Sequence, residues 1–134
     1  MRVRFFIDTH YLLWAALNSP RMEPWAKRLI GDLNNEILVS AASIYEISLK
    51  VRNGKLPEAV EFESDLIFNV ENRLGYRLLP MEPAEMMCAA RFSDSHADPF
   101  DRMIAAQAIR NNLPILSTDA KLDAFGVRRM KQSA

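Results

Sequence analysis

Residues 2–9 of this 134-residue chain read Arg2-Val3-Arg4-Phe5-Phe6-Ile7-Asp8-Thr9. The apolar part is short, β-branched and aromatic, and it stops at an acidic residue, so it predicts a buried strand that ends at Ile7. The run Ile37-Leu38-Val39 has the same character. Runs that are apolar on both faces are typical of a parallel sheet that helices cover on each side. These two runs therefore predict the centre of an α/β fold.

Helical and strand-like segments alternate along the rest of the chain. Helices are expected at residues 10–17, 24–33, 40–51, 59–74, 83–92, 99–112 and 120–125, and further strands at 77–79, 113–116 and 127–130. We expect a three-layer α/β/α sandwich with a central, mainly parallel sheet of four to five strands. Residues 1–134 are expected to form one domain with its core between about residues 3 and 130.

The composition excludes several classes of protein. Lysine plus arginine and aspartate plus glutamate number 17 each, so bulk charge does not attract nucleic acid, and such binding needs local patches or bound metal. The lone Cys88 forms no internal disulfide, favours a reducing compartment and fits a small buried apolar residue. Asp8 and His10 interrupt a would-be signal sequence, and no apolar run approaches the roughly 18 residues of a membrane span. We expect a soluble, cytoplasmic protein without a membrane partner.

Two carboxylates open the apolar helix that begins near Pro99. Pro99 fits the first helical position, Asp98 the N-cap, and Asp101 the first turn, where the helix dipole favours negative charge. A well-capped core helix explains this segment completely, so these two residues do not by themselves indicate a functional site.

Other acidic residues point to the same edge of the sheet. Asp8 and Asp119 each follow an expected strand, and Glu46 lies about two turns into the helix after the second strand. Ligands of open α/β sheets bind beyond the carboxyl ends of the strands. Each residue also has a local explanation: a turn for Asp8, a capping box with Ser43 for Glu46, and an N-cap for Asp119. Those explanations do not account for the shared location.

Clustered carboxylates need a counter-charge in a desolvated site, and a divalent cation supplies it. The candidate ligands are oxygens, which suit Mg²⁺ or Mn²⁺. His10 and His96 lack the spacing of paired metal ligands, and a structural or surface role is expected for both. Such a site supports metal-assisted attack of water on a phosphodiester.

Several motifs together resemble those of PIN-domain ribonucleases, and in particular the VapC-like toxins of toxin–antitoxin pairs. The resemblance runs from Val3 to about Met130. It rests on four segments in the family's order: Phe6-Ile7-Asp8-Thr9-His10, Ser40-Ala41-Ala42-Ser43-Ile44-Tyr45-Glu46-Ile47, His96-Ala97-Asp98-Pro99-Phe100-Asp101-Arg102 and Leu116-Ser117-Thr118-Asp119. Tyr45 stands where the family often has tryptophan, which should affect packing and not chemistry.

The resemblance implies an α/β/α fold and RNA cleavage with Mg²⁺ or Mn²⁺. Asp8, Glu46 and Asp101 match the core acidic ligands, and Asp119 matches a more peripheral fourth acid, so these four are the implied catalytic residues. Asp98 lies one turn before Asp101 and competes with it for the metal. Thr9 and Thr118 match positions that support the site through their hydroxyl groups.

The resemblance also implies partners. RNA has to reach an acidic cleft, and the candidates for a phosphate-facing rim are Lys50, Arg52, Lys55 and Arg102, although each also fits a solvated helix face. VapC-like toxins are held inactive by a small antitoxin whose helix lies in an apolar groove. Candidates for lining that groove, each of which also fits the core, are Trp14, Trp25, Leu56 and Phe62. A homodimer is the family habit.

Two other functions remain open on the sequence. A haloacid-dehalogenase-type phosphatase uses an aspartate after the first strand, but it needs a second aspartate where this chain has His10. A non-catalytic PIN-like or receiver-like binding module would keep the fold without turnover. The sequence does not name the RNA target or the number of metal ions.

Overall fold

The computed structural model describes residues 2–93 and 98–132, and a parallel sheet of four strands lies at its centre. The strands are β1 (Arg4–Ile7), β2 (Glu36–Ser40), β3 (Arg77–Leu79) and β4 (Ile115–Leu116), in the spatial order β3-β2-β1-β4. Every strand pair is parallel. The α/β prediction is therefore confirmed.

Alternate residues of the central strands point to opposite faces of the sheet, and both faces are buried. Phe5, Ile7 and Val39 join one apolar cluster, and Phe6 and Leu38 join another. All five side chains are fully buried. This arrangement explains why the strands read as continuous apolar runs.

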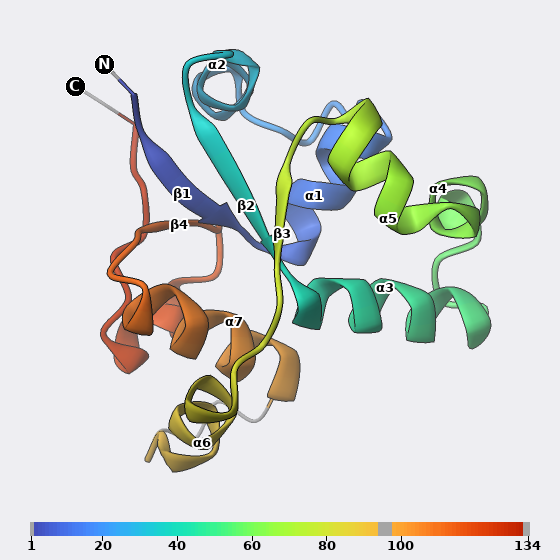
Figure 1. Ribbon diagram of the computed structural model, residues 1–134. Helices are drawn as coiled ribbons and strands as arrows, with labels where there is room; N and C mark the ends of the chain where they lie inside the picture. Colours follow the sequence, from blue (N-terminus) through green and yellow to red (C-terminus); the bar gives the residue numbers. More distant parts are fainter. Residues whose placement is uncertain (1, 94–97, 133–134) are drawn as a thin grey trace.

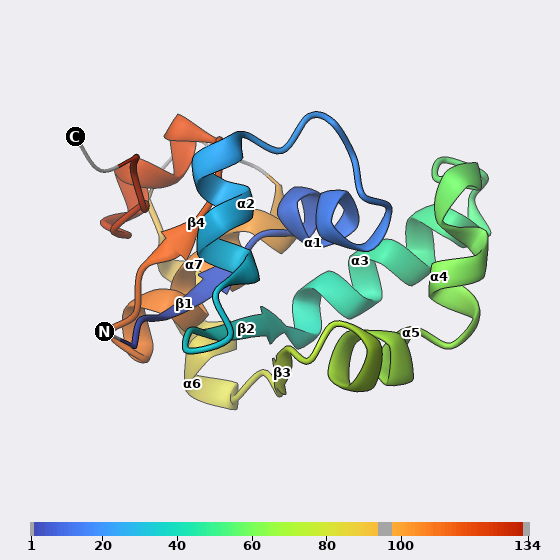
Figure 2. The ribbon, with the colours of Figure 1, turned by 90° about the horizontal axis from the view of Figure 1, so that it is seen from above.

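Helices cover both faces, as Figures 1 and 2 show. The first cluster includes side chains from α1 (Thr9–Ala16), α2 (Pro24–Gly31), α3 (Ala41–Arg52) and α5 (Leu66–Phe68). The second is closed by α7 (Pro99–Arg110) and the 3₁₀ helix η3 (Ala120–Phe125), and α6 (Pro83–Arg91) packs on the outside of α7. The three-layer arrangement is confirmed. Within residues 2–93 and 98–132, no helix has the length and apolar content needed to cross a membrane.

The long helix predicted for residues 59–74 is wrong in detail. The segment comprises η1 (Pro57–Ala59), α4 (Val60–Ser64), α5 and the π-helical turn η2 (Asn69–Arg73). Asp65 leaves the helical region with φ −139° and ψ 53°, and this break separates α4 from α5. The break re-aims the chain so that Leu66 and Val70 both reach the core.

The strand predicted at residues 127–130 is also shorter than expected. In the part of the chain that the structure describes, it contributes a single parallel bridge between Ile115 and Arg129, and the sheet has four strands. The backbone of Met130 still donates to the carbonyl of Ile115, at 2.9 Å, so the segment lies along β4 without extending the ladder.

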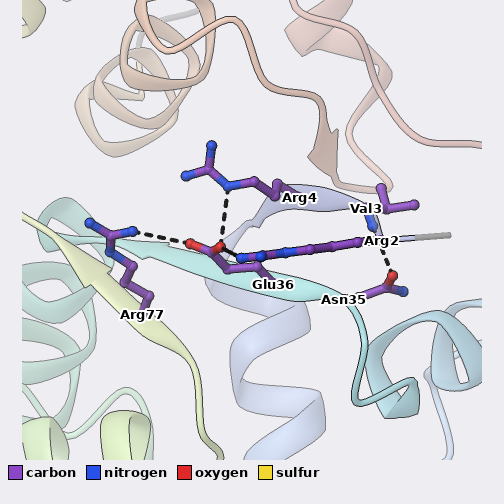
Figure 3. A network of polar contacts seen from close by, with 6 residues as sticks. All are labelled: Arg2, Val3, Arg4, Asn35, Glu36 and Arg77. Carbon is purple, nitrogen blue, oxygen red and sulfur yellow. Dashed lines mark hydrogen bonds and ion pairs between the residues drawn. The ribbon is translucent and has the colours of Figure 1, made fainter.

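A network of charges lies at the amino edge of the sheet, where the strands begin (Figure 3). Glu36 accepts hydrogen bonds from Arg2 and Arg77, and Arg4 pairs with the same carboxylate at 3.3 Å. Partial burial raises the pKa of Glu36, but the three arginines outweigh it and hold that pKa below its usual value. These cross-strand pairs tie β1, β2 and β3 together at this end.

Candidate active site

The strand register gathers the polar residues that follow β1, β2 and β4 at one edge. Ile7 pairs with Val39 on one side and with Leu116 on the other, so the residues after them are neighbours. Asp8 caps α1, because its Oδ1 accepts from the backbone N–H of Tyr11 at 2.9 Å. The residue is only 6 % exposed. The local role foreseen for Asp8 was a turn, whereas the structure makes it an N-cap that engages one carboxylate oxygen.

Glu46 projects from α3 toward the start of α1, and both its carboxylate oxygens have partners. The Thr9 hydroxyl lies 2.6 Å from Oε1, and the Lys50 ammonium lies 2.6 Å from Oε2. Thr9 also contacts the Ser43 hydroxyl at 3.0 Å. Glu46, Thr9 and Ser43 are all buried. A carboxylate taken out of water needs such partners, and this one has a hydroxyl and a cation.

Burial perturbs the carboxyl group of Asp8. Burial raises the pKa of Asp8, and the negative charge of Glu46 raises it further. The Tyr11 N–H, a hydrogen bond from Ser117 and the charge of His10 act in the opposite direction and do not compensate. The geometry therefore holds two buried carboxylates close enough to repel, the situation that favours binding of a cation.

Ser117 links Asp8 to the loop after β4. Its hydroxyl bonds the Asp8 carboxylate and accepts from the backbone N–H of Asp119 at 3.0 Å. Ser117 is buried, whereas Thr118, the expected supporting hydroxyl, is exposed. Ile115 and Leu116 are both fully buried and belong to the apolar clusters on opposite faces of the sheet, and Ser117, the next residue, is buried as well. We therefore replace Thr118 by Ser117 as the supporting group.

The first turn of α7 lies against α3. The rings of Tyr45 and Phe100 meet edge to face with centroids 5.7 Å apart, one residue before Glu46 and Asp101 respectively. Asp98 is the N-cap: its Oδ1 accepts from the N–H groups of Phe100, at 2.8 Å, and Asp101, at 3.2 Å. The structure thus gives Asp98 a capping role and leaves Asp101 on the first turn, half-buried.

Asp119 is the N-cap of η3, because its carboxylate accepts from the backbone N–H of Lys121 at 3.0 Å. The pKa of Arg129 is raised mainly by its hydrogen bond to Asp123, and the negative charge of Asp119 raises it further. His10 is exposed and its ring faces Trp14 at 6.1 Å. His96 lies outside the described residues.

Of the residues expected on a phosphate-facing rim, Arg102 has another role. Its guanidinium donates to the carbonyls of Ala89 (3.1 Å) and Phe92 (2.6 Å), at the end of α6, and stacks on the rings of Phe92 and Phe125. These contacts direct it away from a rim, so we correct that expectation. Arg52 and Lys55 are exposed, and Lys50 lies within the site.

The donor chemistry of this edge suits a hard divalent cation, since the side chains that meet there offer carboxylate and hydroxyl oxygens. The burial of both Asp8 and Glu46 supports this fit, because two carboxylates taken out of water at one place need a counter-charge. In residues 2–93 and 98–132, however, no group of three or more His, Cys, Asp or Glu side chains is placed to hold a metal ion. Asp8 and Glu46 are the pair that the structure brings together most clearly.

Four apolar residues were expected to line one groove for an antitoxin helix. In residues 2–93 and 98–132, three of them line three different cavities. Trp14 lines a cavity of about 170 Å³, Trp25 one of about 430 Å³, and Phe62 one of about 730 Å³. Leu56 packs against the core with them. Their large apolar side chains lie on different elements, and the core takes up most of each.

Three polar residues of this edge have roles that sequence reasoning did not assign to them: Ser43, Ser117 and Lys50. Ser43 and Ser117 carry buried hydroxyl groups, one helical turn from Glu46 and directly after β4 respectively, and the Ser43 hydroxyl accepts from Thr9. The spacing of four residues between Glu46 and Lys50 also indicated an ion pair on one helix face. Lys50 was instead expected on a phosphate-facing rim or on a solvated helix face.

Comparison with known proteins gives the family and the fold. The model of the PIN domain family matches residues 5–127. A search of curated proteins finds no significant match.

Several solved structures share this fold at low sequence identity. FitAcB from Neisseria gonorrhoeae has a TM-score of 0.66 at 18 % identity, covering 98 % of both chains. VapBC2 from Rickettsia felis, bound to a promoter DNA fragment, has a TM-score of 0.70 at 15 % identity, covering 96 % of this chain and 98 % of that one. FitAB bound to an IR36 DNA fragment has a TM-score of 0.61 at 19 % identity, covering 97 % and 94 %.

Proposed function

Since this chain belongs to the PIN domain family, we propose that it is an endoribonuclease that hydrolyses RNA phosphodiester bonds with Mg²⁺ or Mn²⁺. The catalytic residues in this proposal are Asp8, Glu46, Asp101 and Asp119, with Asp98 in a capping role beside them. The observation that carries it is the pair of buried carboxylates, Asp8 and Glu46, at the carboxyl edge of a parallel sheet. A chain that needed only a stable fold would gain nothing from burying two like charges there.

The chain's own residues fix the two carboxylates before any substrate arrives. Thr9 holds one oxygen of Glu46, and Ser43 holds Thr9. Ser117 and the Tyr11 N–H hold Asp8. A divalent cation bound at these carboxylates would polarise the phosphodiester and lower the pKa of an attacking water. Rigid placement matters, because small displacements of such groups are costly to the rate.

We also propose that this protein is the toxin of a toxin–antitoxin pair and acts in the cytoplasm, a reducing compartment that suits its free Cys88. The support is the nature of its structural neighbours, since FitAcB and VapBC2 are such assemblies. The proposal includes a cognate antitoxin and a homodimer as partners. Size-exclusion chromatography with light scattering tests the dimer, for which a monomer at micromolar concentration is the contrary result.

The 730 Å³ groove between the end of α1 and the segment 57–74 is the best candidate for the antitoxin. Leu17 and Val60 are exposed apolar side chains on it, and its acidic residues Glu58, Glu61 and Asp65 outnumber Arg73. This combination fits an amphipathic antitoxin segment with basic side chains. The double variant Glu58→Lys, Glu61→Lys should weaken that complex, whereas an unchanged affinity would exclude this groove.

Cleavage of total cellular RNA tests the proposed activity. Purified protein should release discrete fragments in Mg²⁺ or Mn²⁺ and none in EDTA, and Asp8→Asn should be inactive. Asp32→Asn is the matched control, because Asp32 is exposed at the opposite edge and its amide would still accept from Asn34. Absence of cleavage by a folded protein under either metal would favour the binding-module alternative.

A further inference from the structure

The lysine that pairs with Glu46 belongs to the candidate active site, because it contacts one of the two buried carboxylates. Lys50 follows Glu46 by four residues on α3, and its ammonium lies 2.6 Å from Oε2. The Glu46 side chain is 7 % exposed and that of Lys50 is 37 % exposed. The acidic partner is thus buried, while the basic partner reaches it from the solvent side.

This pair differs from an ordinary surface ion pair on a helix. Exposed pairs at this spacing contribute little, because water screens both charges. Here the carboxylate of Glu46 is buried, and its other oxygen already accepts a hydrogen bond from the Thr9 hydroxyl. Lys50 therefore supplies the positive charge that a buried carboxylate beside Asp8 requires.

The oxygen that Lys50 occupies is the one Glu46 would offer to a metal ion. Oε1 accepts from Thr9 at 2.6 Å, and Oε2 from Lys50 at the same distance. An ammonium and a divalent cation cannot both lie at normal contact distance on the same face of one oxygen without strong repulsion between them. Lysine is a flexible point charge and can swing away, because its stem has four rotatable carbons and its end is part-exposed.

We propose that Lys50 is a built-in counter-ion for Glu46 that a divalent cation displaces, so that this lysine sets how tightly the site binds metal. The inference rests on the proposed metal-dependent function. Without metal, Lys50 keeps the site folded and its charge balanced. With metal bound, the released ammonium is free to contact a phosphate of the RNA at the same edge.

Calorimetric titration with Mn²⁺ alone tests this inference on the intact chain. Lys50→Met keeps the length and apolar stem of the side chain and removes its charge. We expect Lys50→Met to bind Mn²⁺ about tenfold more tightly than the unmodified chain, because the cation no longer competes with an ammonium group for Oε2 of Glu46. Lys55→Met, on an exposed residue five positions later, is the control and should bind Mn²⁺ with unchanged affinity.

Thermal unfolding separates this role from a purely structural one. Without metal, Lys50→Met should have a lower melting temperature than the unmodified chain, because Glu46 is left buried without its cationic partner. Saturating Mn²⁺ should remove that difference in melting temperature. A merely structural ion pair would leave the variant less stable at every Mn²⁺ concentration. If Lys50→Met does not fold without metal, Lys50→Gln retains a hydrogen-bond donor and serves in the same two measurements.

The outcomes distinguish the inference from the proposed function. Equal or weaker Mn²⁺ binding by Lys50→Met, with normal binding by the unmodified chain, overturns the role of Lys50 and leaves the metal site standing. Binding of Mn²⁺ by Lys50→Met and not by the unmodified chain also supports the inference, because it means that Lys50 keeps the cation away from Glu46. Failure of both to bind Mn²⁺ at millimolar concentration overturns the metal site and the inference with it.

Discussion

At the scale of residues, the candidate site consists of two buried carboxylates, each supported by a hydroxyl group. Ser117 holds Asp8, and Thr9 holds Glu46. The acids were predictable from sequence, because acidic residues after strands stand out. The hydroxyl that supports Asp8 was placed one residue too far along, at Thr118, because sequence does not show which of two adjacent polar residues turns inward.

Replacing Asp8 by asparagine separates charge from structure. Asparagine caps a helix about as well as aspartate, so the cap at α1 survives. Burial raises the pKa of Asp8, which means that its ionised form is disfavoured in the folded protein. We expect Asp8→Asn to lose RNA cleavage by about a thousandfold, the effect of several kcal/mol at a metal-assisted step. Its melting temperature in metal-free buffer should be unchanged or higher.

A large fall in the melting temperature of Asp8→Asn would instead assign Asp8 a structural role. Asp32→Asn is the parallel control in both assays and should cleave RNA and melt like the unmodified chain.

Replacing Ser117 by alanine tests the support of Asp8. The change removes the hydroxyl that bonds the Asp8 carboxylate and that accepts from the Asp119 N–H. We expect the rate of RNA cleavage to fall by roughly 10- to 100-fold, as is usual for groups that orient metal ligands. Thr118→Ala, on the exposed neighbour, should retain the full rate. Equal losses in the two variants would contradict the assignment of Ser117.

At the scale of elements, the start of α7 was predicted well and the segment 59–74 was not. Pro99 and the Asp98 cap are local signals, so the beginning of α7 follows from sequence. The break at Asp65 depends on how Leu66 and Val70 reach the core, which is tertiary information. The same reason explains why Arg102 was expected at the rim: its carbonyl partners at the end of α6 are distant in sequence.

Removal of the Arg102 guanidinium tests its role in fastening α6 to α7. Arg102→Met keeps much of the apolar stem and removes the donors to Ala89 and Phe92. We expect the free energy of unfolding to fall by about 2 kcal/mol, from the loss of charge-assisted hydrogen bonds to backbone carbonyls. Arg110→Met, at the exposed end of α7, should have no such effect in the same denaturant titration.

RNA affinity distinguishes the two roles considered for Arg102. If it fastens the helices, the folded fraction of Arg102→Met binds RNA normally. A selective loss of RNA affinity with normal stability would restore it to the rim.

At the scale of the whole molecule, the two edges of the sheet have opposite character. The carboxyl edge holds buried acids, and the amino edge holds Glu36 among three arginines (Figure 3). The order of elements and the parallel sheet followed from the alternation of apolar runs and helical segments. Pairs of residues on neighbouring strands, such as Arg77 with Glu36, depend on the order of the strands in the sheet. That order is not encoded in the local sequence.

The arginine network should make stability depend on pH. Because the folded pKa of Glu36 is depressed, its contribution is present above the unfolded pKa, near 4.5, and is lost as the pH falls through the folded value. We expect Glu36→Gln to be less stable than the unmodified chain by about 1 kcal/mol at pH 7 and in low salt. The difference should disappear below the folded pKa. A difference that persists in strong acid would show that the carboxylate charge is not its cause.

The chemical nature of the cleaved ends tests the central claim most directly. A labelled RNA that the protein cuts should be treated with the unmodified chain and with Asp8→Asn, in Mg²⁺ and in EDTA, and its ends analysed. Attack by an activated water leaves a phosphate monoester and a free hydroxyl and forms no 2′,3′-cyclic phosphate. The account predicts such ends only with metal and only for the unmodified chain. Cyclic phosphate ends, or equal cleavage in EDTA or by Asp8→Asn, would contradict it.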